Sequence, residues 1–72
     1  MEFKVGMKVK ATYGEYNGRC GVVAYCGGSG EVGVDFKGDT TGRGHNLSGF
    51  LKTSTGWWVL RNNLIPMEIV NV

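Results

Sequence analysis

The sequence has little of what membrane spans, signal peptides and long helices require. Charged residues make up 19% of its 72 residues, and it contains a single proline. No apolar run approaches the roughly 18 residues of a membrane-spanning helix. The first ten residues, MEFKVGMKVK, lack the apolar core of a signal peptide. We therefore expect a cytoplasmic protein without membrane association.

Cysteine is equally scarce, with only Cys20 and Cys26. If residues 20–26 form one strand, six steps of about 3.3 Å separate the two by roughly 20 Å. A disulfide needs Cα atoms within about 7 Å, so we expect packed, reduced thiols. The paired C-x2-C spacing of zinc modules is absent, which argues against a metal held by these cysteines and His45. Phosphate-binding glycine motifs are absent too, so we expect neither a metal nor a cofactor.

Glycine is abundant instead. It occupies 13 of the 72 positions, about 18% against an average near 7%. That content has no period of three, which argues against collagen, and it disfavours long helices. It fits tight turns between short strands.

Hydrophobic alternation and β-branched runs predict short strands along the whole chain. We expect strands at residues 7–13, 20–26, 31–37, 57–60 and 64–70, with a further short strand near Phe50–Lys52. In the strand at residues 7–13, the odd-numbered residues Met7 to Tyr13 share one face. In the third, Val32, Val34 and Phe36 point inward.

Two shorter stretches predict connections. Residues 27–30, GGSG, form a hairpin turn, and Asn62-Asn63 form a tight turn or one turn of 3₁₀ helix. Pro66 cannot donate to a ladder, which places the last strand at a sheet edge or at a local break.

About five antiparallel strands in one domain, residues 1–72, favour an all-β fold. A small closed or half-open barrel removes the exposed edges that a single flat sheet would leave. The SH3-like barrel fits this length better than the OB fold, which usually has more residues and a helix.

Two stretches carry a resemblance. Residues 5–36, VGMKVKATYGEYNGRCGVVAYCGGSGEVGVDF, resemble the KOW-type strand–loop–strand of ribosomal and transcription-factor SH3-like barrels. GHNLSG at 44–49, followed by GWWV at 56–59, resembles small uncharacterised phage and prophage proteins with a KOW-like first half. The resemblance covers about three quarters of the chain. It implies an SH3-like barrel encoded by a phage or mobile element, without a settled activity.

The chain also echoes the eukaryotic SH3 domains that bind proline-rich peptides, through ATYGEY at 11–16, WW at 57–58 and LIPMEIV at 64–70. The spacing differs, because those domains hold a whole hairpin between the Trp pair and the Ile-Pro segment. Their acidic loop is missing too, since Glu15 stands alone in GEYNG. Proline-rich recognition is therefore disfavoured.

The adjacent Trp57 and Trp58 give the sharpest prediction about a site. Neighbouring strand residues point to opposite faces, so one indole enters the core and the other lies outside or at the rim. The resemblance implies that Trp57 is the core residue. Trp58 is then a candidate anchor for a partner, because aromatic residues dominate interfaces. Alternatively, residues 38–55 fold over Trp58 and bury it.

His45 is the only histidine, and no triad spacing surrounds it. We interpret it as a loop residue that hydrogen-bonds backbone carbonyls and packs on a Trp. The candidate partner-binding residues are Trp58, Tyr13, Tyr16, Arg43, His45, Lys52 and Arg61.

The leading hypothesis is a non-enzymatic binding module that engages a host or phage protein through its loops and an exposed aromatic patch. The alternative is a KOW-type nucleic-acid-binding barrel, in which Arg19, Arg43, Lys52 and Arg61 meet phosphates beside stacked aromatic residues. The net charge of +2 is far from the dense basic stripe typical of such proteins. No small-molecule substrate is expected.

Overall fold

The computed structural model describes residues 2–27, 30–39 and 41–67. The described chain forms five strands and two short 3₁₀ turns. They are β1 (Lys8–Ala11), β2 (Cys20–Cys26), β3 (Glu31–Asp35), η1 (Leu47–Gly49), β4 (Gly56–Leu60), η2 (Arg61–Asn63) and β5 (Leu64–Pro66). These residues contain no α-helix, and none of their helical turns could cross a membrane.

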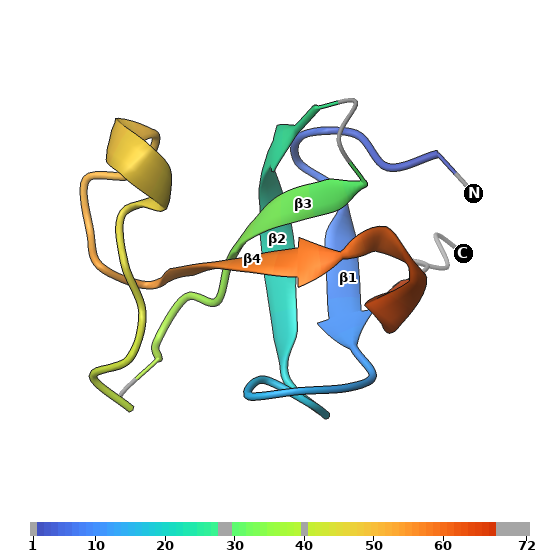
Figure 1. Ribbon diagram of the computed structural model, residues 1–72, viewed down its shortest axis with the longest axis horizontal. Helices are drawn as coiled ribbons and strands as arrows, with labels where there is room; N and C mark the ends of the chain where they lie inside the picture. The colour runs from blue at the N-terminus through green and yellow to red at the C-terminus, as the bar shows by residue number, and fades with distance from the viewer. Residues whose placement is uncertain (1, 28–29, 40, 68–72) are drawn as a thin grey trace, which may run out of the picture.

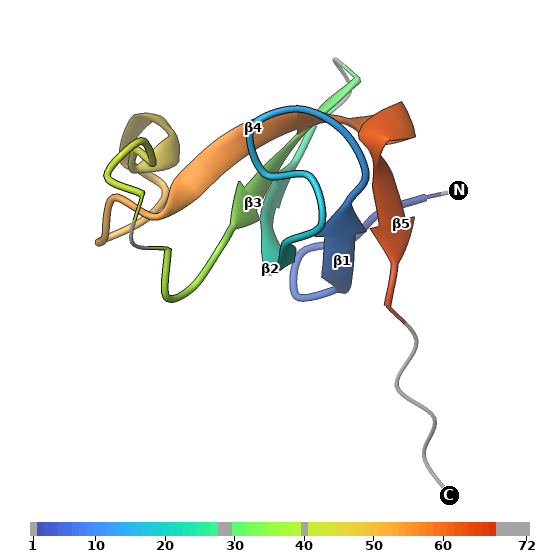
Figure 2. The same ribbon diagram turned by 90° about the horizontal axis from the view of Figure 1, so that it is seen from below.

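The strands form one antiparallel sheet in the order β4-β3-β2-β1-β5 (Figure 1). Laid flat, such a sheet would separate β4 and β5 by about 19 Å, four steps of about 4.8 Å. The three residues of η2 join these two edge strands directly, so the sheet must curl, as Figure 2 shows. The predicted all-β fold is confirmed, and it is consistent with a small SH3-like barrel.

The concave side of the curled sheet holds the core. Its buried residues are Phe3, Val9, Ala11, Tyr16, Val23, Val32, Val34, Phe36, Val59 and Leu64. The inward positions predicted for β3 and the residue after it are thereby confirmed. Tyr16 stacks on Phe36 with ring centroids 4.4 Å apart, which brings the loop between β1 and β2 down onto the core.

A β-bulge in β2 changes which side chains face inward. Val23 pairs with Val34, but the next pair is Tyr25 with Gly33, so Ala24 has no partner in the ladder. An extra residue reverses the alternation that follows it. Tyr25 therefore lies on the outer face, whereas Cys26 packs against the core.

Several predicted boundaries differ from the structure. The strand expected near Phe50–Lys52 is wrong, because residues 47–50 form η1 and a turn, and residues 52–54 form a bend. Pro66 does lie on an edge strand, β5, which ends there; residues 68–70 of the predicted strand lie outside the described residues. The 3₁₀ turn predicted at the Asn62-Asn63 pair is confirmed. Residues 28–29 of the GGSG turn also lie outside the described residues.

Both cysteines are free thiols, as predicted. Cys26 is half-buried, and its Sγ donates a hydrogen bond to the Phe3 carbonyl at 2.9 Å. Cys20 is exposed rather than packed, because its side chain points to the outer face of β2.

Candidate functional site

Among the described residues, the outer edge of β4 has a backbone partner only at its first residue. At its start, the backbone N–H and C=O of Gly56 bond to His45, at 2.7 and 3.0 Å. Backbone groups alternate in direction along a strand, so those of Trp58 also point away from β3. Figure 1 shows β3 on one side of β4 and the loop between β1 and β2 on the other.

A groove of about 130 Å³ follows this open edge. It is lined by Tyr13, Gly14, Glu15, Tyr16, Trp57, Trp58, Val59, Leu60 and Asn63. Four consecutive residues of β4 take part, although their side chains alternate between the two faces of the sheet. Such a groove must run along the backbone edge of the strand, and we call it the edge groove.

Aromatic rings form the walls of the edge groove. Tyr13, 72% exposed, stands on the loop between β1 and β2. Trp57 is half-buried and packs against the core, with its ring 5.3 Å from Tyr16 and 5.4 Å from His45 between centroids. Tyr16 itself is buried, so it supports the groove from below rather than offering a free ring.

Tyr16 also anchors the segment that follows β3. Its hydroxyl donates a hydrogen bond of 2.6 Å to Asp39 Oδ2, and Arg19 lies 3.5 Å from the other carboxylate oxygen. The hydrogen bond from Tyr16 and the backbone N–H of Thr41 lower the pKa of Asp39. Burial and the bond to Asp39 raise the pKa of Tyr16. The carboxylate therefore stays ionised and holds the two loops together.

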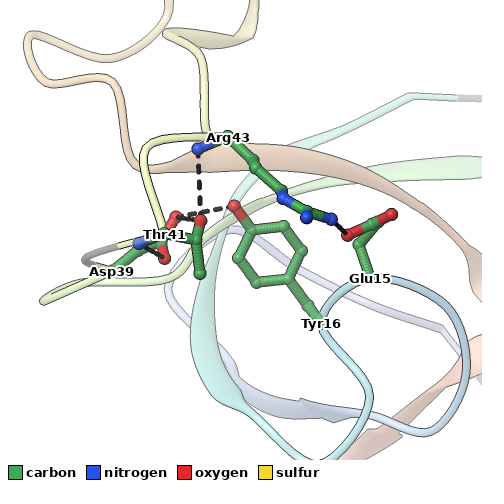
Figure 3. Close-up of polar contacts among 5 residues, drawn as sticks. All are labelled: Glu15, Tyr16, Asp39, Thr41 and Arg43. Atoms are coloured by element: carbon green, nitrogen blue, oxygen red, sulfur yellow. Dashed lines mark hydrogen bonds and ion pairs between the residues drawn. The ribbon is translucent and has the colours of Figure 1, made fainter.

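A second link joins the same two loops at the surface. Arg43 forms an ion pair with Glu15, and Figure 3 shows its side chain reaching alongside the Tyr16 ring. The Thr41 hydroxyl accepts the Arg43 backbone N–H at 3.2 Å and donates to Asp39 at 3.1 Å. Arg43 thus holds Glu15 in place at one end of the edge groove.

His45 packs on a Trp as predicted, but the hydrogen bond predicted from its ring to a backbone carbonyl is wrong. Its Nδ1 accepts a hydrogen bond from the Leu47 N–H at 3.1 Å, and its ring packs on Trp57. The bonded backbone group is an N–H rather than a carbonyl. His45 therefore orients both Trp57 and the start of η1.

Trp58 lies on the face of the sheet opposite Trp57. It stands edge-on to Tyr25, with centroids 5.7 Å apart, and both residues pair in register with Gly33. A Cβ at Gly33 would lie 2.9 Å from Trp58 Cζ3 and 3.1 Å from Leu47 Cδ1. The glycine thus leaves room for the indole and Leu47 to pack on bare backbone.

The segment 44–55 partly covers this outer face. Leu47 is fully buried, and a Cβ on Gly56 would approach Leu47 Cγ to 2.5 Å. Phe50 packs on Tyr25 at 4.6 Å yet stays 59% exposed. Trp58 is consequently half-buried. The sequence allowed either an exposed Trp58 or a buried one, and the structure shows an intermediate exposure.

The predicted partner-binding residues thus divide between separate places. Tyr13 and Tyr16 line the edge groove with Trp57, and His45 packs on Trp57. Arg43 pairs with Glu15 at one end of the groove, whereas the Trp58 indole lies on the other face. Lys52 is exposed in the loop before β4, and Arg61 donates to the Gly27 carbonyl at 3.3 Å. Sequence reasoning missed Glu15, Trp57 and Asn63 as groove residues, although the candidates Tyr13 and Tyr16 lie on the same loop as Glu15.

A second, wider hollow of about 260 Å³ lies on the outer face of β1–β3. It is lined by Lys8, Cys20, Gly21, Val22, Asp35, Lys37 and Met67. We call it the outer groove. Lys8 and Lys37 have no ion-pair partner among the described residues. Asp35 also lines the outer groove, so two lysines and one aspartate give it a formal charge of +1.

Within residues 2–27, 30–39 and 41–67, no three His, Cys, Asp or Glu side chains gather as a metal site would need. Comparisons of the chain with protein-family models, with curated proteins and with solved structures find no match.

Proposed function

We propose that the protein is a small, non-enzymatic binding module that holds a segment of another protein in the edge groove. The observation that supports this most is that exposed Tyr13 and half-buried Trp57 line the same groove beside the outer edge of β4. Aromatic side chains offer large contact area with few rotatable bonds, so they form the strongest points of protein interfaces.

The rigidity of the groove favours binding further. The loop between β1 and β2, which supplies one wall, is held to the segment after β3 by the Tyr16–Asp39 hydrogen bond and the Arg43–Glu15 ion pair. Trp57 is held between Tyr16 and His45. A site that is ordered before binding loses less conformational entropy when the partner arrives. His45 and Asp39 have structural partners, which fits a binding role better than acid–base catalysis.

The test is selection of peptides from a displayed library of random 12-residue sequences against the immobilised chain. Enriched peptides are then synthesised with a fluorophore, and their Kd values are measured by anisotropy. We expect Tyr13→Ala to weaken binding at least 10-fold, because it removes one wall of the edge groove.

Phe50→Ala is the matched control, since Phe50 is also an exposed aromatic residue but lies on the opposite face. It should change the Kd less than 2-fold. The proposal fails if no peptide is enriched, or if Phe50→Ala weakens binding as much as Tyr13→Ala does.

Nucleic-acid binding is a second candidate, favoured by Lys8 and Lys37 at the outer groove. The cations first considered for this role support it less, because Arg19 and Arg43 are already ion-paired. The probe for this alternative is a labelled 20-nucleotide single strand of RNA or DNA.

Nucleic-acid binding predicts an affinity that falls steeply between about 50 and 200 mM salt. It also predicts that binding is lost in the double variant Lys8→Ala/Lys37→Ala and kept in the control Lys52→Ala. A peptide in the edge groove should bind almost independently of salt.

A further inference from the structure

We propose that the bound segment enters the edge groove as an added β-strand, hydrogen-bonded to the backbone of β4. This inference rests on the proposed function and specifies how the same site recognises its partner. An extended polypeptide is the occupant, because only another extended backbone offers alternating donors and acceptors at the spacing of a strand.

The hydrogen bonds between β3 and β4 determine which backbone N–H and C=O groups of β4 are free. The Thr55 carbonyl accepts from Phe36, and the Arg61 N–H donates to Gly30, so odd-numbered residues between them face β3. Even-numbered residues face the open edge, and Gly56 uses its groups on His45. Trp58 and Leu60 remain, about 7 Å apart along the strand.

Three backbone groups at this edge make no backbone hydrogen bond within residues 2–27, 30–39 and 41–67. Trp58 presents its N–H and its C=O, and Leu60 presents its N–H. The Leu60 carbonyl faces inward to the first turn of η2, because a 3₁₀ turn bonds each carbonyl to the N–H three residues on. The added strand is therefore short.

The two ends of the open edge fix the length of the added strand. His45 occupies the edge at Gly56, and η2 begins at Arg61. About three residues of a partner can pair in between. Side chains at alternate positions of that partner would lie over Trp57 and Tyr13, while the intervening ones point away. Backbone pairing thus fixes the register of the partner strand on β4, and the aromatic walls select which partner side chains fit.

Leu60 allows a sharp test, because its backbone suits proline. Its φ of −62° and ψ of 139° match the angle that the proline ring imposes. Its N–H makes no ladder bond, and proline is tolerated on edge strands where the N–H faces outward. Leu60→Pro therefore removes one donor from the edge groove without breaking the sheet. Leu60→Ala is the matched control, since it loses the same side chain but keeps the N–H.

The probes are the peptides selected in the library experiment above. We expect Leu60→Pro to bind them about 3- to 10-fold more weakly than Leu60→Ala does, the effect of one lost hydrogen bond. If both variants bind equally while Tyr13→Ala still weakens binding at least 10-fold, strand addition is overturned and the proposed function stands. If Tyr13→Ala has no effect, both fail.

Amide hydrogen exchange of the unmodified chain provides a second readout, which does not depend on the folding of Leu60→Pro. In the free protein the amides of Trp58 and Leu60 should exchange quickly, whereas those of Trp57 and Val59 are protected by β3. A saturating selected peptide should slow exchange at Trp58 and Leu60 at least 10-fold. Unchanged exchange at both positions, or protection already present without peptide, would contradict strand addition.

Discussion

The hydroxyl of Tyr16 and the carboxylate of Asp39 are joined by a 2.6 Å hydrogen bond across 23 positions of sequence. The bond ties the loop between β1 and β2 to the segment after β3. Those two segments fix one end of the edge groove, because the same segments also supply Glu15 and Arg43. The integrity of the site therefore depends on this contact.

Tyr16→Phe should lower the free energy of unfolding by about 1 kcal/mol, the typical net value of one hydrogen bond. The ring would keep its stacking on Phe36, so only the hydroxyl contact is lost. Urea unfolding followed by Trp fluorescence measures the change. Tyr13→Phe is the control, because the Tyr13 side chain is exposed, and it should leave stability unchanged. Equal effects of the two substitutions would contradict the role of the Tyr16–Asp39 bond.

The same bond predicts how stability depends on pH. The hydrogen bond from Tyr16 lowers the pKa of Asp39 in the folded state, relative to about 3.9 in the unfolded chain. The resulting stabilisation is fully present above that unfolded value and is lost as pH falls through the lower folded pKa. Urea midpoints measured from pH 6 down to pH 2 should therefore fall less steeply for Tyr16→Phe than for the parent chain. Parallel curves would argue against this linkage.

Gly33 should resist even the smallest side chain. A Cβ there would press on the Trp58 ring and on Leu47, so we expect Gly33→Ala to destabilise the fold by about 1–3 kcal/mol. A double-mutant cycle with Leu47→Ala tests the cause, because removing the Leu47 side chain opens space beside the new methyl group. The combined loss should be smaller than the sum of the two single losses. If the two losses of stability simply add, the strain caused by Gly33→Ala does not come from contact with Leu47.

Trp58 should contribute more to stability than an exposed anchor would. Its indole packs on Gly33 and beside Tyr25, so Trp58→Ala should cost roughly 2–3 kcal/mol, against less than about 1 kcal/mol for an exposed aromatic residue. Phe50→Ala provides that comparison. Thermal and urea unfolding measure both variants, and similar losses would show that the Trp58 contacts contribute little.

Regular alternation made most of the sheet predictable. The bounds of β2 agree at both ends with the prediction, and Val32, Val34 and Phe36 are buried as expected. The opposite faces of Trp57 and Trp58 follow from the same period of two. Alternation fails at the bulge beside Ala24, where no residue type in the sequence signals an extra position.

The segment before β4 could not be predicted from local patterns. Its conformation depends on Leu47 and Ser48, which adopt φ of 53° and 57°, a region that such residues rarely enter. The burial of Leu47 against Gly33 and Gly56 accounts for that conformation, and such a contact between distant residues leaves no local signal. The edge groove was missed for a related reason, because it arises from a loop and a strand that meet only after the sheet curls.

The most direct test of the account is a map of backbone amide chemical shifts as a selected peptide is added to the isotope-labelled chain. Binding in the edge groove predicts that the largest changes fall at residues 13–16, 57–60 and 63. The chemical shifts of amides around the outer groove, at Val22, Asp35 and Lys37, should not change. Changes concentrated at the outer groove, or around Tyr25 and Phe50, would contradict the proposed site.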